Sequence, residues 1–217
     1  MSDGTAAVSD LEMISDEPNF QEWLATQLRR CGWEVHREVK SDRKTVNDGR
    51  YRADIIAKNE NLGQEWVGIE TKWLNSLKEG SKIGGALNQI TNQYWHTDFE
   101  GRSVDLWAVS PYIDAQFATR HAKETQKIIK LTTHHLQQLV REMLCVYGIG
   151  YLSPTGSYGV IDFGYSVAHR KIPAFDLRNP VPERHYENVD MEKTANAVLK
   201  KRKELYTELD VPEEVDT

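Results

Sequence analysis

The stretch that decides the fold runs from Arg52 to Trp73 and reads RADIIAKNENLGQEWVGIETKW. Its two ends, 52–58 and 66–73, are rich in apolar and β-branched residues, which favour β-strands. The segment between them, 59–65, has the polar and glycine content of a hairpin loop. The stretch therefore predicts two antiparallel strands joined by a loop centred on Leu62.

A loop centred on Leu62 fixes which residues lie opposite each other, because their numbers then sum to 124. In this register Asp54 lies opposite Glu70, and Lys72 points to the same side of the sheet as Glu70. Cross-strand partners have β-carbons roughly 4.5–5.5 Å apart, so the three charged side chains would converge on one spot. A slip of one residue would separate them.

Three charged groups at one place within apolar strands have two interpretations. Two close carboxylates repel unless a positive charge lies between them, and hard oxygen ligands suit Mg²⁺. A neighbouring lysine supplies a compact charge and a proton donor, so the set could activate water and stabilise a pentavalent phosphate. The alternative is a surface ion network of Asp54, Glu70, Lys72 and Arg52 without a catalytic role.

Charge is unevenly distributed along the chain. The 217 residues carry a net charge of −6, and the charged and hydrophobic fractions of 28% and 39% are those of a globular protein. Residues 1–17 and 204–217 hold eleven acidic residues and no lysine or arginine, which leaves a body of 27 basic and 22 acidic residues. A basic body can bind a phosphate backbone, and solvated surface charge is the alternative reading. The candidates for backbone contacts are Arg37, Lys40, Arg43, Lys44 and Arg50.

The elements around the hairpin follow from periodicity. Pro18 and the apolar spacing after it predict a helix from about residue 16 to residue 30, which carries Glu22. A strand at 33–39 precedes a polar, basic loop at 40–51 that we expect to lie over a substrate. A helix from Ile83 to Tyr94 has the amides of Gln89 and Gln93 on a polar stripe, and the nearly continuous apolar run at 104–110 predicts a central strand.

The second half of the chain is less informative. It predicts a helix at 132–147, a peripheral hairpin with strands at 149–152 and 158–163, an irregular segment at 174–187 and a helix at 190–208. The basic run at 200–203 is either a phosphate-contacting helix end or a solvated face. Two cysteines give neither a disulfide framework nor a zinc pattern.

Several classes of function are not expected. The Gly/Lys/Ser stretch at 78–85 lacks P-loop spacing, so we expect no nucleotide triphosphate site. No apolar run approaches the ~20 residues of a membrane helix, and the acidic N-terminus lacks the features of a signal peptide. These features predict no membrane partner and a cytoplasmic location.

On these residues and their order, positions 17–110 resemble the PD-(D/E)xK nuclease superfamily. The resemblance implies an α/β fold with a mixed sheet and a restriction-endonuclease-like αβββαβ core. It implies that Asp54, Glu70 and the main-chain carbonyl of Thr71 hold Mg²⁺, for which Mn²⁺ would substitute, and that Lys72 acts at the scissile phosphate. It also matches Glu22 to the helix glutamate near the metal, for which an ordinary helix glutamate is the alternative. Gln89, Gln93 and Arg52 are candidates for site support or DNA contact, with a solvated helix face as the alternative for the two glutamines.

The expected function is hydrolysis of DNA phosphodiester bonds, with an endonuclease favoured over an exonuclease or a junction resolvase. A non-catalytic DNA-binding or assembly module and an RNA-acting nuclease are the alternatives. We expect an acidic tail at 1–15, a nuclease core at 16–113, an elaboration packed on it at 114–205, with a helical part and a β-hairpin, and a second acidic tail at 206–217. A symmetric homodimer would suit an enzyme that cuts both strands.

Overall fold

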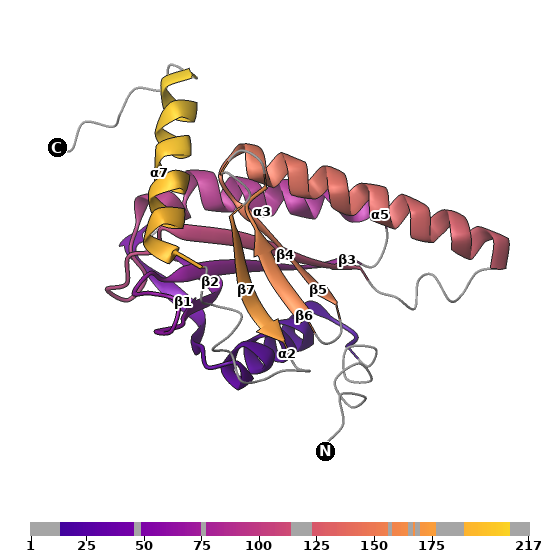
Figure 1. The fold of residues 1–217 in the computed structure, drawn as a ribbon, viewed down its shortest axis with the longest axis horizontal. Helices are drawn as coiled ribbons and strands as arrows, with labels where there is room; N and C mark the ends of the chain where they lie inside the picture. The colour runs from indigo at the N-terminus through magenta and orange to yellow at the C-terminus, as the bar shows by residue number, and fades with distance from the viewer. Residues whose placement is uncertain are drawn as a thin grey trace.

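The protein forms one mixed seven-stranded sheet with helices on both faces (Figure 1). The computed structural model describes residues 14–45, 49–74, 77–113, 123–155, 158–164, 167, 170–176 and 189–208. The strands lie side by side in chain order: β1 (Glu34–Lys44), β2 (Arg50–Lys58), β3 (Val67–Leu74), β4 (Leu106–Ile113), β5 (Gly150–Thr155), β6 (Tyr158–Asp162) and β7 (Lys171–Asp176). The β3–β4 and β4–β5 pairs are parallel and the other pairs are antiparallel. The predicted α/β class with a mixed sheet is therefore confirmed.

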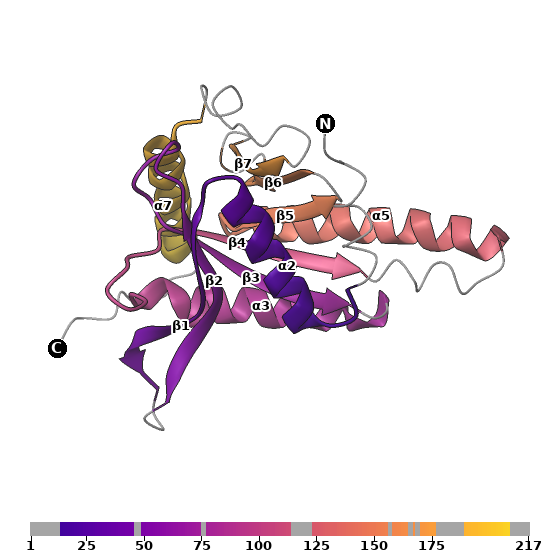
Figure 2. The same cartoon turned by 90° about the horizontal axis from the view of Figure 1, so that it is seen from below.

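Two layers of helices cover the sheet, as Figures 1 and 2 show from two sides. The helices are α2 (Glu17–Arg30), α3 (Ser81–Asn92), α5 (Lys123–Val146) and α7 (Met191–Glu208), with short 3₁₀ turns η1 (Leu77–Gly80) and η2 (Tyr94–His96). Helices α2 and α7 pack into one buried cluster with Ile55 and Ile69, whereas α3 and α5 pack into a second cluster with Ile56 and Val109. Alternate residues of the strands thus enter opposite cores.

The predicted elements of the first half form in the expected order, helix, three strands, helix and strand, from α2 to β4. Helix α2 begins after Asp16, whose carboxylate accepts a hydrogen bond of 2.9 Å from the amide of Asn19. Such a cap satisfies one of the free amides of the first turn. Strand β4 is central, as predicted, because three strands lie on each side of it.

The register predicted for the hairpin is confirmed. Strands β2 and β3 are antiparallel, with Ile55 opposite Ile69, Ile56 opposite Gly68 and Ala57 opposite Val67. Each pair of numbers sums to 124, so the continuation of this register places Asp54 at the level of Glu70.

The loop predicted at 40–51 is wrong, the helix predicted at 132–147 forms but begins earlier, and of the irregular segment predicted at 174–187 only residues 174–176 are described. The segment 40–51 is not a loop: β1 continues to Lys44 and β2 starts at Arg50, so the pair forms a long hairpin, and residues 46–48 at its turn lie outside the described residues. The helix expected at 132–147 begins at Lys123. Part of the segment 174–187 belongs to β7, where Pro173 is tolerated because β7 is an edge strand.

The second half of the chain extends the sheet of the first half. Strand β5 pairs with β4, and the predicted second hairpin forms as β5 and β6. The expected C-terminal helix forms as α7, but its basic run is not wholly solvated. Arg202 is buried, donates a hydrogen bond of 2.6 Å to the carbonyl of Asp105, and lies 4.3 Å from the centre of the Trp95 ring.

Both expected acidic tails fall largely outside the described residues, which begin at 14 and end at 208. Within the described part of the chain, none of the helices combines the length and apolar character needed to cross a membrane.

The contact between Gly68 and Trp107 generates a stability prediction. These residues are direct partners in β3 and β4, and a Cβ at position 68 would overlap the fully buried Trp107 ring. We expect Gly68→Ala to lower the free energy of unfolding by about 1–3 kcal/mol, measured by urea denaturation. Gly84 is the matched control because a Cβ there meets nothing within 4 Å on the exposed side of α3. Gly84→Ala should stabilise by up to about 1 kcal/mol, and equal effects of the two changes would contradict the assigned packing.

Candidate functional site

The site lies where β2 parts from β3. The paired residues of the two strands end at Ile55 and Ile69, and the next residue of β2 is Asp54. Its carboxylate oxygen Oδ2 accepts hydrogen bonds from the main-chain amide of Thr71 at 2.7 Å and from the Thr71 hydroxyl at 2.8 Å. The Asp54 carboxylate therefore replaces a main-chain carbonyl as the acceptor for the Thr71 amide, and the two hydrogen bonds hold Asp54 beside β3.

Glu70 and Lys72 lie on the same strand and form an ion pair. The Lys72 ammonium donates a hydrogen bond of 2.7 Å to Oε1 of Glu70. The side chain of Glu70 is only 2% exposed and that of Lys72 13%, although both residues are charged types. Continuation of the β2–β3 register places Asp54 beside them, so the expected convergence of Asp54, Glu70 and Lys72 is present.

Tyr94 is a member of the site that the sequence analysis missed. Its hydroxyl donates to the main-chain carbonyl of Arg52 at 2.8 Å and lies 3.3 Å from Oε2 of Glu70. Its ring packs edge-on against Phe99 and 4.7 Å from the centre of the Trp107 ring. The apolar stripe of the preceding helix correctly predicts that Tyr94 is buried but gives no sign that its hydroxyl reaches a carboxylate.

Glu17, rather than Glu22, is the helix glutamate at the site. Oε2 of Glu17 accepts a hydrogen bond of 2.8 Å from the amide of Trp73, and Oε1 lies 3.9 Å from the Lys72 ammonium. Glu22 instead pairs with Arg37 and Arg29 at the surface. The two positions are five residues apart, so they lie on different sides of α2, and the placement predicted for Glu22 is corrected.

Burial controls the protonation of the three groups. Burial raises the pKa of Glu70 to about 7, and the nearby Asp54 carboxylate adds to this increase. Burial also raises the pKa of Asp54, against the opposing effects of Lys72 and the Thr71 hydrogen bonds. Burial alone would lower the pKa of Lys72, but the adjacent carboxylates, Glu70 foremost, raise it above its ordinary value. The site thus contains a firmly charged lysine between carboxyl groups that are reluctant to ionise.

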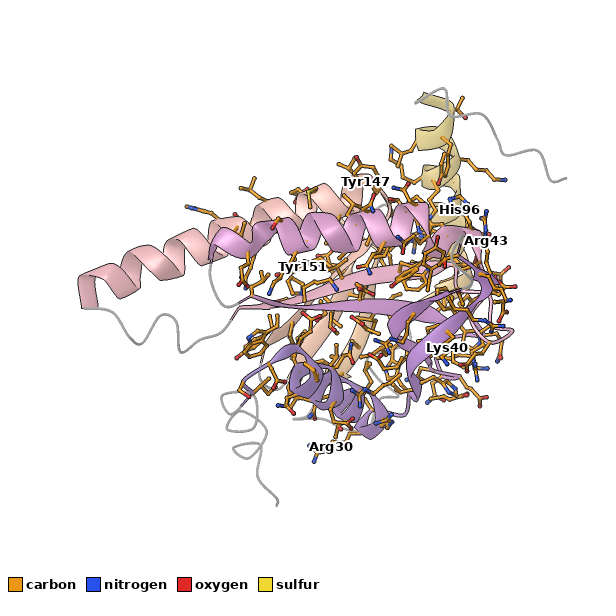
Figure 3. The ribbon with its side chains drawn as sticks, turned by 180° about the vertical axis from the view of Figure 1, so that it is seen from behind. Arg30, Lys40, Arg43, His96, Tyr147 and Tyr151 are labelled. Carbon is orange, nitrogen blue, oxygen red and sulfur yellow. The ribbon has the colours of Figure 1, made fainter. Side chains whose placement is uncertain are left out.

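The remaining predicted residues lie around the site rather than in it. Within the described part of the chain, no hydrogen bond or ion pair links the side chains of Gln89 or Gln93 to the three charged residues. Arg37 bonds to Glu22 and Gln21, and Arg52 pairs with Glu38. The other cations predicted to contact DNA, namely Lys40, Arg43, Lys44 and Arg50, are exposed on the β1–β2 hairpin, where Figure 3 labels Lys40 and Arg43.

The donor set fits a hard divalent cation. Asp54 and Glu70 are anionic oxygen donors on adjacent strands, and burial makes their joint ionisation costly without added positive charge. Among the described residues there is no cluster of three or more His, Cys, Asp or Glu side chains suited to a metal. A bound ion would take its other ligands from water and from the main-chain carbonyl of Thr71 that the sequence resemblance suggests, and Mg²⁺ suits such a set because it retains several waters.

Comparison with family models, with curated proteins and with solved structures found no match. The functional inference therefore depends on the residues of this site and their geometry.

The raised pKa of Glu70 predicts how stability depends on pH in the absence of metal. Between its unfolded pKa near 4.3 and its folded pKa of about 7, the folded protein holds a proton that the unfolded chain has lost. Stability contributed by Glu70 is therefore full below the unfolded pKa and is lost as pH rises through about 7. Glu70→Gln has no such loss, so its unfolding free energy relative to the parent should rise by on the order of 2–3 kcal/mol between about pH 4 and about pH 8.

Urea denaturation in EDTA at several pH values measures this difference. Glu60→Gln is the control, since Glu60 is a largely exposed glutamate of the β2–β3 loop. A difference between Glu70→Gln and the parent that does not change with pH would contradict the assignment. Mg²⁺ should stabilise the parent at about pH 8 and have little effect on Glu70→Gln, because only the parent retains both anionic ligands.

Proposed function

We propose that the protein is a divalent-metal-dependent nuclease that hydrolyses DNA phosphodiester bonds, with endonucleolytic cleavage favoured. The observation that carries the proposal is the set of buried Glu70 with half-buried Asp54 and Lys72 at the point where β2 leaves β3. Buried charged groups are costly, and such sets with perturbed pKa values concentrate at functional sites.

Each residue has a distinct role in the proposed reaction. Asp54 and Glu70, with the Thr71 carbonyl, would hold Mg²⁺ or Mn²⁺, which supplies Lewis-acid activation of water and charge stabilisation at phosphorus. Thr71 fixes Asp54 through two hydrogen bonds, and Tyr94 limits the movement of Glu70. Lys72 donates to Glu70 with one of its three N–H groups, so the other two are suited to the attacking water or to a phosphate oxygen on which charge develops.

The surroundings of the site favour a nucleic acid as substrate. The β1–β2 hairpin, whose second strand holds Asp54, carries exposed lysines and arginines, and phosphate groups neutralise such cations on binding. The parallel sheet beyond β3 supplies a rigid base, so the charged groups stay in place while substrate binds.

Removal of either catalytic side chain should abolish most cleavage. With supercoiled DNA and Mg²⁺, we expect Asp54→Ala and Lys72→Ala to lower kcat by ~10²–10³, because each removes charge that stabilises the transition state. Lys58→Ala is the matched control, since Lys58 is also a lysine at a strand end of the hairpin but bonds to Gln64 away from the site.

The same assay separates the alternatives. Parallel reactions use linear, single-stranded and branched DNA, RNA, and EDTA in place of Mg²⁺. Parent-like cleavage by both alanine variants would overturn the site assignment. Metal-independent binding of DNA with no turnover in Mg²⁺ or Mn²⁺ would favour a binding module, and selective turnover of RNA would favour an RNA-acting enzyme.

The two glutamates of α2 give a further prediction. Glu17→Gln should lower the cleavage rate by roughly 10–100-fold, the usual cost of removing an outer group that orients the residues of an active site. Glu17 acts in this way through its contact with the Lys72 ammonium. Glu22→Gln should retain parent activity because Glu22 pairs with surface arginines. Initial cleavage rates under saturating Mg²⁺ check both variants. A larger loss for Glu22→Gln than for Glu17→Gln would contradict the assignment of Glu17 to the site.

A further inference from the structure

Glu38 has a backbone conformation that is unusual inside a strand. Its φ is +53°, whereas extended strands have φ near −120 to −140°. Within the described residues, the only other non-glycine residue with positive φ is Glu100, at +49°, which lies in the tight turn closed by Phe99 and Arg102. A turn accounts for Glu100, but Glu38 lies within β1 and its strain needs another reason.

The strained residue lies across from the catalytic aspartate. Strand β1 pairs Arg37 with Ile55 and Val39 with Ala53, so Glu38 falls at the level of Asp54. The side chains change faces at this level: Val35 and Ile55 pack on the α2 side of the sheet, whereas Val39 and Ala53 pack on the α3 side. The outer half of the hairpin is therefore turned relative to the inner half beside the site.

The carboxylate of Glu38 binds a neighbouring arginine. Its Oε2 lies 2.6 Å from Nε of Arg52, whose side chain is 64% exposed. The main-chain carbonyl of Arg52 is the acceptor for Tyr94, so the arginine is attached to the site through its own backbone.

We propose that Glu38 is a positioning residue that holds the Arg52 guanidinium at the open side of the site, where it binds a DNA phosphate next to the bond to be cut. This inference rests on the proposed nuclease function. The ion pair engages Nε and leaves the two terminal nitrogens, which can bind two phosphate oxygens at once. The turn in β1 accounts for a positive φ at position 38, but glycine would adopt it with less strain, and an exposed ion pair adds little stability. Stability therefore does not account for a glutamate at this position.

The test combines single and double variants in the DNA cleavage assay. Glu38→Gln should raise KM about tenfold and leave kcat within about twofold of the parent, since the lost contact serves binding. Arg52→Ala should raise KM at least as much and reduce the slope of log KM against log salt by about 0.9, the contribution of one phosphate contact on duplex DNA. In the Arg52→Ala background, Glu38→Gln should have no further effect, because its only route to the substrate is gone.

Two glycine substitutions separate positioning from backbone strain. Glu38→Gly and Glu100→Gly both relieve a positive φ at a glutamate, so neither should lower the unfolding temperature by more than a few degrees. Glu38→Gly should raise KM as Glu38→Gln does, whereas Glu100→Gly should leave KM unchanged.

A decrease in KM on Glu38→Gln, rather than the expected increase, overturns the inference. Removal of a negative charge near DNA, without any positioning role, would tighten binding and lower KM. If the parent cuts DNA, two results refute the positioning role alone. One is a KM for Glu38→Gln that equals or lies below the parent KM. The other is an increase in KM on Glu38→Gln that is as large in the Arg52→Ala background as in the parent. A parent that does not cut DNA in Mg²⁺ or Mn²⁺ refutes the proposed function, and the positioning role with it.

Discussion

The structure depends on one exchange of partners: the carboxylate of Asp54 replaces a backbone acceptor for the amide of Thr71 where β2 leaves β3. This exchange opens a gap in an otherwise continuous sheet without leaving the Thr71 amide unsatisfied, which burial would penalise. The gap is then lined by Glu70, Lys72 and the Tyr94 hydroxyl. Two carboxyl groups and one ammonium group are tolerated at this partly buried place because they neutralise each other in part, and burial together with the Asp54 carboxylate still raises the pKa of Glu70.

The core and the site are mechanically joined through aromatic side chains. Trp107 covers Gly68 on β3 and contacts both Phe99 and Tyr94, and Tyr94 reaches Glu70. A side chain at position 68 would overlap the Trp107 ring, so this packing requires glycine. The ring in turn supports Tyr94, so packing on the adjacent strand β4 influences how firmly the Glu70 carboxylate is held.

Sequence alone could predict the parts of the fold that follow from local periodicity. The β2–β3 register follows from a symmetric loop, and the central position of β4 follows from its apolar run. Helical spacing places Glu17 in line with Phe20 and Leu24 and Glu22 off that stripe, but periodicity gives no sign that a glutamate in the first turn reaches Lys72 on a neighbouring strand. It also missed the hydroxyl of Tyr94 and the buried guanidinium of Arg202, since both residues fit ordinary patterns and their partners, Arg52 and Asp105, are distant in sequence. The strands within 40–51 were not predicted because their residues are polar on both faces, so the sequence shows no alternation of apolar and polar residues.

The same argument explains why the hairpin is strained beside Asp54. If β2 had stayed paired with β3, Asp54 would have been one more strand residue and no gap would exist. Because β2 turns away, its partner β1 must turn with it, and the positive φ of Glu38 is where β1 makes this turn. The turn brings Val39 and Ala53 into the α3-side core, which compensates in burial for the strained backbone. A single change in strand direction at the site thus accounts for the separation of β2 from β3, for the turn of β1 at Glu38 and for the exposed position of Arg52.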